Sequence, residues 1–335
     1  TEDAGAEIVI EAVPSAQLHR AAPGAACFTV PEVESWAAYA RAGYRAPDWA
    51  GITTRRQVTV FLPSDATGQE ARSCLQEELA QALGPLNDLY RLADSVFNDD
   101  DMEGTLTGFD MLALRALYAP ELHSGMSRTE VAARLPAILA RLNPAGGSGA
   151  AGPVQDDGSW RRDIETALSP TNSPAARIDA AARASRASQR FAAGDPRAGF
   201  GAYVYGRQLM TRDPAEARRQ LEIAARAYGL SRLTEIQSAH VAVQLARLDL
   251  ATGDPATARN RAHAASPIAA AHEDAALFAE LALIEAEALD RLGLSSEAEA
   301  LRLDSLPAAR YGLGSETIIG QMRRSIAAFR PAKES

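Results

Sequence analysis

The first third of the chain alternates hydrophobic and polar positions with the period of two that is typical of β-strands. Residues 7–13 read Glu-Ile-Val-Ile-Glu-Ala-Val, and residues 57–62 read Gln-Val-Thr-Val-Phe-Leu before Pro63 ends the run. Residues 25–30, which include Cys27, have the same strand-like character. We therefore predict three strands and a mixed α and β structure for this part of the chain.

From Thr67 the period of the pattern changes to 3.6, which predicts amphipathic helices. The first helix has Asp65 or Thr67 as its N-cap and ends at Gly84-Pro85. Its apolar stripe consists of Ala71, Leu75, Leu79, Ala82 and Leu83. A second helix follows Thr107 and ends at Pro120, and a third runs from Ser127 or Thr129 to Leu142.

A glycine-rich stretch without large apolar residues, 143–153, follows the third helix and is typical of a flexible linker. Beyond it the pattern is helical to the end, so we predict a mixed domain at 1–143, a linker at 144–158 and an all-α domain at 159–330. Because the linker offers almost no apolar surface, modest contact between the domains is expected unless the helices fold back.

Turn signals divide the helical part at regular intervals, which predicts repeated helix hairpins. Three of them, beginning at Arg212, Gly253 and Gly293, are spaced by 40 to 41 residues. Ala258 follows Gly253 as Ala298 follows Gly293, and a small residue at this position allows two helices to approach closely.

Composition and charge exclude several classes of protein. The chain has 335 residues, of which 47% are hydrophobic, and its net charge of −9 argues against nucleic acid as a partner. The chain contains no run of 18 apolar residues, so no transmembrane segment is predicted. Residues 1–10 lack the pattern of an export signal. The chain has no phosphate-binding loop or dinucleotide fingerprint, so no cofactor is predicted.

The two cysteines, Cys27 and Cys74, are too few for a disulfide scaffold and lack zinc-site spacing. They either form two buried thiols or join in a disulfide. A disulfide would close a loop of 47 residues and stabilise the fold by roughly 4 kcal/mol on the chain-entropy model. A disulfide would also indicate an oxidising compartment outside the cytoplasm.

One helical segment has the spacing of a zinc-peptidase motif without its histidines. The metzincin pattern H-E-x-x-H-x-x-G-x-x-H supplies three ligands, a general base and a glycine turn. In this chain the base position is Glu78 and the glycine position is Gly84, and Gly125-Met126 falls at the place of the methionine turn. The three ligand positions are Glu77, Gln81 and Asn87.

The segments around this motif resemble the domain of unknown function 2927 family, a bacterial family. The resemblance covers roughly residues 50–142. It is carried by Cys74, by 77–84, by Ser-Val-Phe-Asn-Asp at 95–99, and by Leu-Tyr-Ala-Pro-Glu-Leu at 117–122 before Gly125-Met126. The resemblance implies a degenerate zincin-like domain. The helical part, most clearly at 286–301, resembles a tetratricopeptide-like array, which implies a curved surface that holds a protein or peptide partner.

Ligand chemistry predicts that zinc hydrolysis is lost, because no two histidines lie four residues apart. Glu77, Gln81 and Asn87 offer one carboxylate and two amide oxygens, which suit calcium or magnesium better than zinc. Binding of either ion by this set alone would be weak, so no metal site is predicted. Glu78 is then expected to be a hydrogen-bonding relic. The acidic segment 98–103 lacks the glycine and glutamate of an EF-hand, and a solvated loop is expected there.

These observations predict a non-catalytic binding or assembly protein of the cell envelope, in the periplasm or otherwise outside the cytoplasm. Its fold class is α+β, with a zincin-like domain followed by a tetratricopeptide-like array. The alternative is an atypical hydrolase, acting on peptides or peptidoglycan, with Glu78 as general acid or base.

Overall fold

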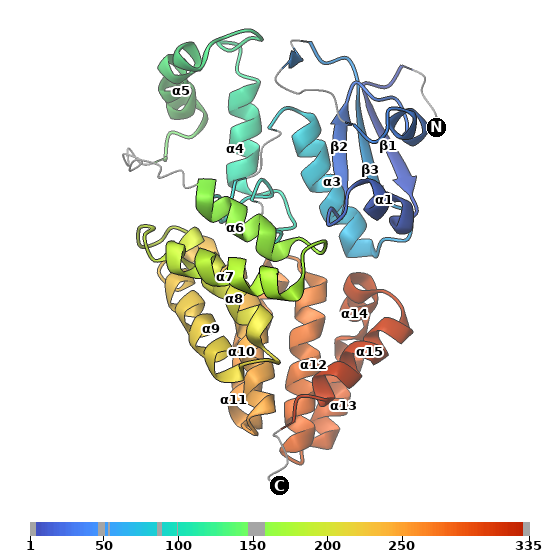
Figure 1. Ribbon diagram of the computed structural model, residues 1–335, viewed down its shortest axis with the longest axis vertical. Coiled ribbons are helices and arrows are strands. Elements are labelled where there is room, and N and C mark those ends of the chain that lie inside the picture. The colour runs from blue at the N-terminus through green and yellow to red at the C-terminus, as the bar shows by residue number, and fades with distance from the viewer. Residues whose placement is uncertain are drawn as a thin grey trace.

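The computed structural model describes residues 5–45, 51–52, 54–85, 89–98, 100–146 and 158–330. A three-stranded sheet and its helices form an N-terminal region, which lies above a helical array of α6 to α15 in Figure 1. The protein is therefore mixed α+β with mostly helical content, as predicted. The linker predicted at 144–158 falls mainly outside the described residues.

The strands are β1 (Ile8–Val13), β2 (Phe28–Pro31) and β3 (Val58–Pro63), in the order β1-β3-β2. β1 runs parallel to β3, with Ile8 opposite Val58, whereas β2 runs antiparallel to β3, with Phe28 opposite Phe61. The central strand is buried from Val58 to Leu62, which explains its nearly continuous apolar sequence.

Alternate side chains of β3 pack on opposite faces of the sheet. On one face, Val60 and Leu62 contact α3 (Gly68–Ala82) through Cys74 and Leu75. On the other face, Phe61 packs with residues of α1 (Ser15–Ala21), β2 and α2 (Trp36–Arg41), which include Leu18, Phe28, Trp36 and Tyr39.

Capping boxes set the start of the three longer helices of the N-terminal region. The pairs are Thr67 with Glu70 at α3, Thr107 with Asp110 at α4 (Gly108–Leu117), and Ser127 with Glu130 at α5 (Arg128–Leu142). The predicted N-caps Thr67, Thr107 and Ser127 are confirmed. In Figure 1, α5 lies at the outer edge of the N-terminal region, where it packs on α4.

The helical array consists of antiparallel neighbours joined by short turns. Its helices are α6 (Gly158–Leu168), α7 (Pro174–Ser188), α8 (Arg197–Leu209), α9 (Pro214–Tyr228), α10 (Glu235–Ala251), α11 (Pro255–Ala271), α12 (Ala275–Arg291), α13 (Ser295–Asp304), α14 (Leu306–Leu313) and α15 (Glu316–Ala327). Asp213 and Asp254 cap α9 and α11, so the predicted turn signals mark helix boundaries. No helix in the described part of the chain is both long and apolar enough to cross a membrane.

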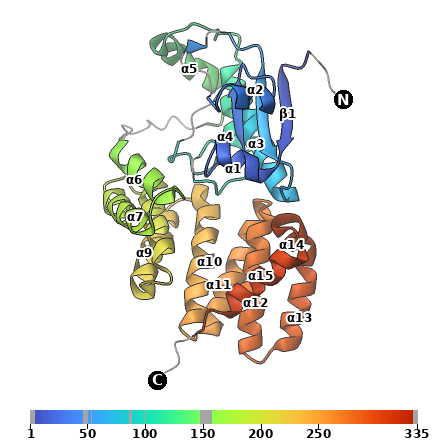
Figure 2. The same ribbon diagram turned by 45° about the vertical axis from the view of Figure 1, so that its right-hand side comes forward.

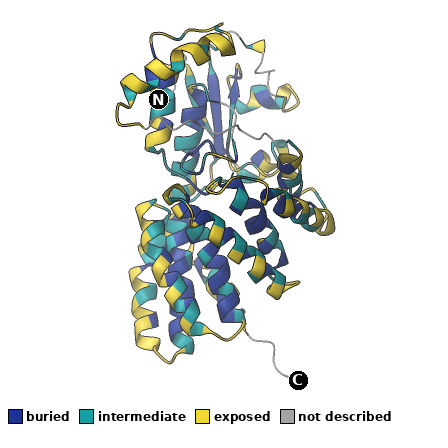
Figure 3. Ribbon diagram, turned by 90° about the vertical axis from the view of Figure 1, so that its left-hand side faces the viewer, coloured by how far each residue is buried: buried dark blue, intermediate teal, exposed yellow. Residues whose placement is uncertain are grey.

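Small residues let the array helices approach closely. Ala217, Ala258 and Ala298 are fully buried at equivalent positions of α9, α11 and α13. A Cβ added to Gly206 of α8 would lie 2.8 Å from Cγ of Leu221, so only glycine allows this crossing of α8 and α9. Figure 3 shows the buried positions concentrated on the faces where neighbouring helices meet.

The last helix turns back across the array. Figures 1 and 2 show α15 crossing α12, and Ile326 of α15 is only 1% exposed in the main core. The Arg291 guanidinium, at the end of α12, donates to the carbonyl oxygens of Leu250 and Ala327. The end of α15 is thereby tied to both α10 and α12.

The N-terminal region and the array share a core. Tyr90 packs edge-on against Trp160 of α6, with ring centroids 5.3 Å apart, and also contacts Phe200 of α8. At the start of α3, the Gln69 side-chain amide donates a hydrogen bond to the Asp274 carboxylate and accepts one from the backbone N–H of Ala276. The contact is therefore broader than the modest one expected from the linker.

The acidic segment lies in this junction, so the prediction of a solvated loop is wrong for most of its described residues. Asn98, Met102 and Glu103 are 4%, 5% and 7% exposed. The Gln237 side chain of α10 donates to the carbonyl oxygen of Ala93 at 2.8 Å. Burial against helices more than 130 residues later in the chain overrides the local preference of these polar residues for solvent.

We expect Ala258→Leu to lower the free energy of unfolding by about 1–3 kcal/mol, because the larger side chain has no space between α11 and its neighbours. Urea denaturation of the full chain measures this. Ala256→Leu on the exposed side of the same helix is the matched control, and equal losses in both variants would contradict the close approach at Ala258.

Candidate functional site

Helix α3 carries most of the motif residues and is held on the sheet from several sides. Its first half packs through Ala71, Cys74 and Leu75 against the central strand. Further along, the Thr29 hydroxyl of β2 donates to the backbone carbonyl of Glu78 at 3.1 Å. The position of the motif residues is therefore fixed by the sheet.

The structure brings two of the three ligand-position residues together. Glu77 and Gln81 lie one turn apart, and the Gln81 Nε2 atom donates to Oε1 of Glu77 at 3.4 Å. Gln81 is 8% exposed and Glu78 is 3% exposed, so both are buried polar side chains. The third position, Asn87, lies outside the described residues.

Gly84 ends the motif in a backbone conformation that requires glycine. Its φ is +147°, and a Cβ at this position would lie 2.5 Å from Cδ2 of Leu117 on α4. Beside it, the Tyr118 hydroxyl donates to the carbonyl oxygen of Leu83 at 2.8 Å. These contacts join the end of α3 to the end of α4.

Met126 lies in the turn between α4 and α5. Its sulfur accepts a hydrogen bond from the backbone N–H of His123 at 3.3 Å. This contact belongs to the turn itself and does not link Met126 to Glu77 or Gln81.

The donor set at the motif does not fit a zinc ion. Glu77 and Gln81 supply carboxylate and amide groups, whereas zinc in proteins prefers imidazole and thiolate. Across the residues that the structure describes, no three or more histidine, cysteine, aspartate or glutamate side chains group closely enough to hold a metal. No chemical step through a metal follows from this geometry.

The two cysteines form a disulfide between the segment before β2 and the middle of α3. The Cα atoms of Cys27 and Cys74 lie 5.9 Å apart, and both residues are buried with Val60 and Leu62. The bond crosses from an edge of the sheet to the helix that covers it, so it restrains the helix that carries Glu77, Glu78 and Gln81.

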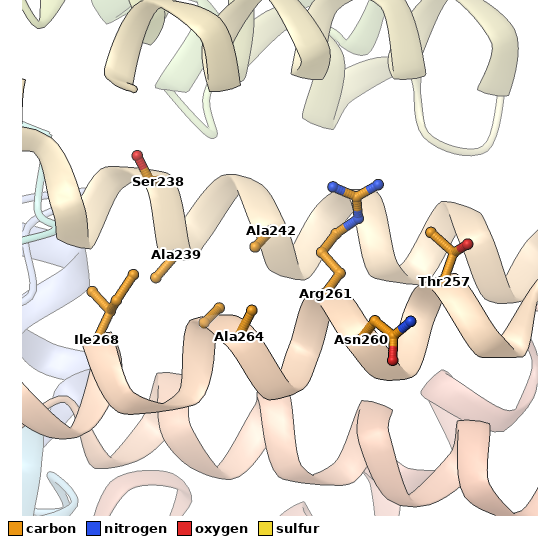
Figure 4. A pocket seen from close by; sticks show the side chains of 9 residues that line it. Ser238, Ala239, Ala242, Thr257, Asn260, Arg261, Ala264 and Ile268 are labelled. Atoms are coloured by element: carbon orange, nitrogen blue, oxygen red, sulfur yellow. The ribbon is translucent and has the colours of Figure 1, made fainter. Parts of the chain in front are cut away.

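A groove lies on the array between α10 and α11, with a volume of about 460 Å³. Figure 4 shows alanines along its floor, with Thr257, Asn260 and Arg261 toward one end and Ser238 and Ile268 toward the other. The apolar residues are Ala239, Ala242, Ala264, Ala265 and Ile268, and the polar ones are Ser238, Thr257, Asn260 and Arg261.

Ion pairs between α9, α10 and α11 lie beside this groove. Arg261 contacts Asp249 of α10 at 3.0 Å, and Arg218 of α9 contacts the same carboxylate at 2.7 Å. The Asp249 side chain is 3% exposed, whereas the arginines are 32% and 29% exposed. Asp254, the N-cap of α11, also interacts with both arginines, so the two positive charges at this end of the groove face two negative ones.

Sequence reasoning did not find the groove residues or the buried acidic segment. The groove alanines of α10 and α11 follow the same helical period as the buried alanines of the core. The sequence pattern therefore does not distinguish alanines that line the groove from alanines that are buried between helices. The partners of the acidic segment are distant in sequence, and no local signal identifies them.

Residues 1–137 match the family model described as Protein of unknown function (DUF2927), so this part of the chain belongs to that family. Comparison with curated proteins and with solved structures gave no significant match. The family assignment rests on the same region that carries the motif and the disulfide.

We expect the double variant Cys27→Ser/Cys74→Ser to lose about 2–4 kcal/mol of unfolding free energy, because its unfolded chain is no longer constrained by a 47-residue loop. Urea denaturation with and without a reductant measures the loss. The reductant should destabilise the natural chain and leave the double variant unchanged. A natural chain that is insensitive to reduction under denaturing conditions would contradict the bond.

Proposed function

We propose that this protein is a non-catalytic binding or assembly protein that works outside the cytoplasm, in the periplasm or elsewhere in the cell envelope. In this proposal the N-terminal region is a degenerate zincin-like domain, and the array is a tetratricopeptide-like surface for a protein partner. The observation that carries the binding role is the groove between α10 and α11.

The proposed partner is a peptide segment of a protein. The alanine floor is shallow and apolar, which suits close approach of a backbone, and Ser238, Thr257 and Asn260 offer hydrogen bonds to main-chain groups.

The proposed compartment is supported by the disulfide between Cys27 and Cys74, because disulfides persist mainly in oxidising compartments. The proposed loss of catalysis is supported by the ligand positions of the motif. Glu77 and Gln81 stand where a zinc peptidase needs histidines, and they contact each other.

We expect photo-crosslinking amino acids to capture the partner from the groove in the native cell. A crosslinker at Ala264, which lines the groove, should give a discrete adduct with one protein, whereas a crosslinker at Ala270 on the same helix should not. Ala264→Trp should abolish co-purification of that protein from the envelope fraction, with Ala270→Trp as control. Equal crosslinking at both positions would contradict a specific groove.

We expect no peptide-bond cleavage when the purified full chain is incubated with an unbiased peptide library. The reason is that neither Glu77 nor Gln81 supplies the imidazole that holds a hydrolytic zinc. Glu78→Ala should therefore behave like the natural chain. Cleavage that a chelator blocks and Glu78→Ala abolishes would establish the hydrolase alternative instead.

A further inference from the structure

Glu103, in the segment between α3 and α4, is buried against the array. The Glu103 Oε2 atom lies 2.6 Å from Nδ1 of His272, the residue that follows α11, and the Glu103 side chain is only 1% exposed. Its other oxygen accepts hydrogen bonds from the backbone N–H and the hydroxyl of Thr105. Glu103 and His272 therefore form an ion pair across the junction when His272 is protonated.

Asp100 is a partly buried carboxylate in the same junction, and the hydrogen bonds it accepts come from neutral donors. Its Oδ1 atom accepts from the backbone N–H of Met102 at 3.1 Å. Its Oδ2 atom accepts from Nε2 of Gln237 at 3.3 Å, and Gln237 is fully buried on α10. Partial removal of a carboxyl from water without a cationic partner disfavours its ionised form, so the closed junction favours the protonated form of Asp100.

Several other titratable groups surround these two contacts. From the segment itself they are Asp94 and Asp101; from α8, Tyr203 and Arg207; from α9, Tyr228; from α10, Glu235 and His240; and from the start of α12, Asp274. His240 lies 3.7 Å from Asp274, and burial lowers its pKa, so this histidine is neutral near pH 7. The nearby charges on the segment are thus mainly negative.

We propose that this junction is a pH-responsive latch, which holds the acidic segment on the array at mildly acidic pH and releases it above neutral pH. The latch consists of Asp100, Glu103 and His272. It governs the contact between the N-terminal region and the array and does not depend on what the groove binds.

The direction follows from the three groups. Burial raises the pKa of Asp100 to about 7, so the stability that its protonated form contributes is lost as pH rises through that value. The hydrogen bond with Glu103 raises the pKa of His272, so its contribution is also lost on the alkaline side. Burial opposes ionisation of Glu103, but the bonds from His272 and Thr105 outweigh it and lower its pKa, so its contribution is lost only in acid.

The expected size of the pH effect on junction opening follows from the pKa of Asp100. In an open junction its carboxyl is already ionised at pH 6, whereas in the closed junction it ionises only near pH 7. The ratio of open to closed junction should therefore rise roughly tenfold between pH 6 and pH 8 from this group alone, and further through His272.

Hydrogen exchange of the full chain, corrected for the intrinsic effect of pH on exchange, tests the latch. Protection of the amides at 93–106 should fall at least about tenfold between pH 6 and pH 8. Amides in the central strand β3 should keep their protection. A natural chain whose 93–106 amides are equally protected at both pH values overturns the proposal, whatever the variants do.

Variants separate the latch from a general effect of charge. Asp100→Asn/His272→Gln should remove most of the pH dependence. Asp101→Asn makes the same charge change as Asp100→Asn at the exposed neighbouring residue, and this variant should retain most of the pH dependence, because burial contributes more than the Asp101 charge to the raised pKa of Asp100. If the double variant does not fold, His272→Gln alone should reduce the fall in protection. An undiminished pH dependence in these variants would show that other groups control the junction.

Discussion

The way the sheet-bearing region meets the array depends on the burial of Tyr90, Met102 and Glu103 between them. Tyr90 reaches the aromatic core of α6 and α8, and Met102 joins the same cluster. The Gln237 Nε2 atom donates a hydrogen bond to the carbonyl oxygen of Ala93 at 2.8 Å, in place of the water that this oxygen would otherwise bind. Since the segment 89–106 connects α3 to α4, its position also decides where the end of the motif helix meets Leu117 and Tyr118.

Helix α3 joins three parts of the protein and explains why its polar residues are fixed. Its start contacts the array through Gln69 and through Arg72, which pairs with Glu273 at 2.7 Å. Its middle is bonded covalently to the segment before β2 through Cys74. Its end carries Glu77, Glu78 and Gln81 and stops at Gly84. Because α3 is held at three places, its position does not require a metal ion bound at the motif residues.

The sequence predicts the elements well where local physics decides them. Thr67, Thr107 and Ser127 each precede a glutamate or aspartate by three residues, and these capping boxes begin the predicted helices. The short helices Ser15–Ala21 and Trp36–Arg41 were not predicted, because one or two turns do not establish a 3.6-residue period. The solvated loop was predicted wrongly, because Gln237 and His272 cover Asp100 and Glu103 from sequence distances of 137 and 169 residues. For the motif, residue types and spacing locate Glu77 and Gln81 on one helix, but only the structure shows that they contact each other.

The order in which the chain is made gives the junction a particular place in folding. The hydrogen bond between Gln69 and Asp274 joins residues 205 positions apart in the chain. The hydrogen bond between Gln237 and Ala93 joins residues 144 positions apart. Contacts between such distant residues close late and slow the folding of a chain. Until α6 and α8 have been synthesised, Tyr90 lacks the aromatic side chains that it packs against, so the partly made protein exposes aromatic surface to aggregation. Completion of the C-terminal helices, rather than of the sheet, is therefore the step after which the N-terminal region reaches its final form.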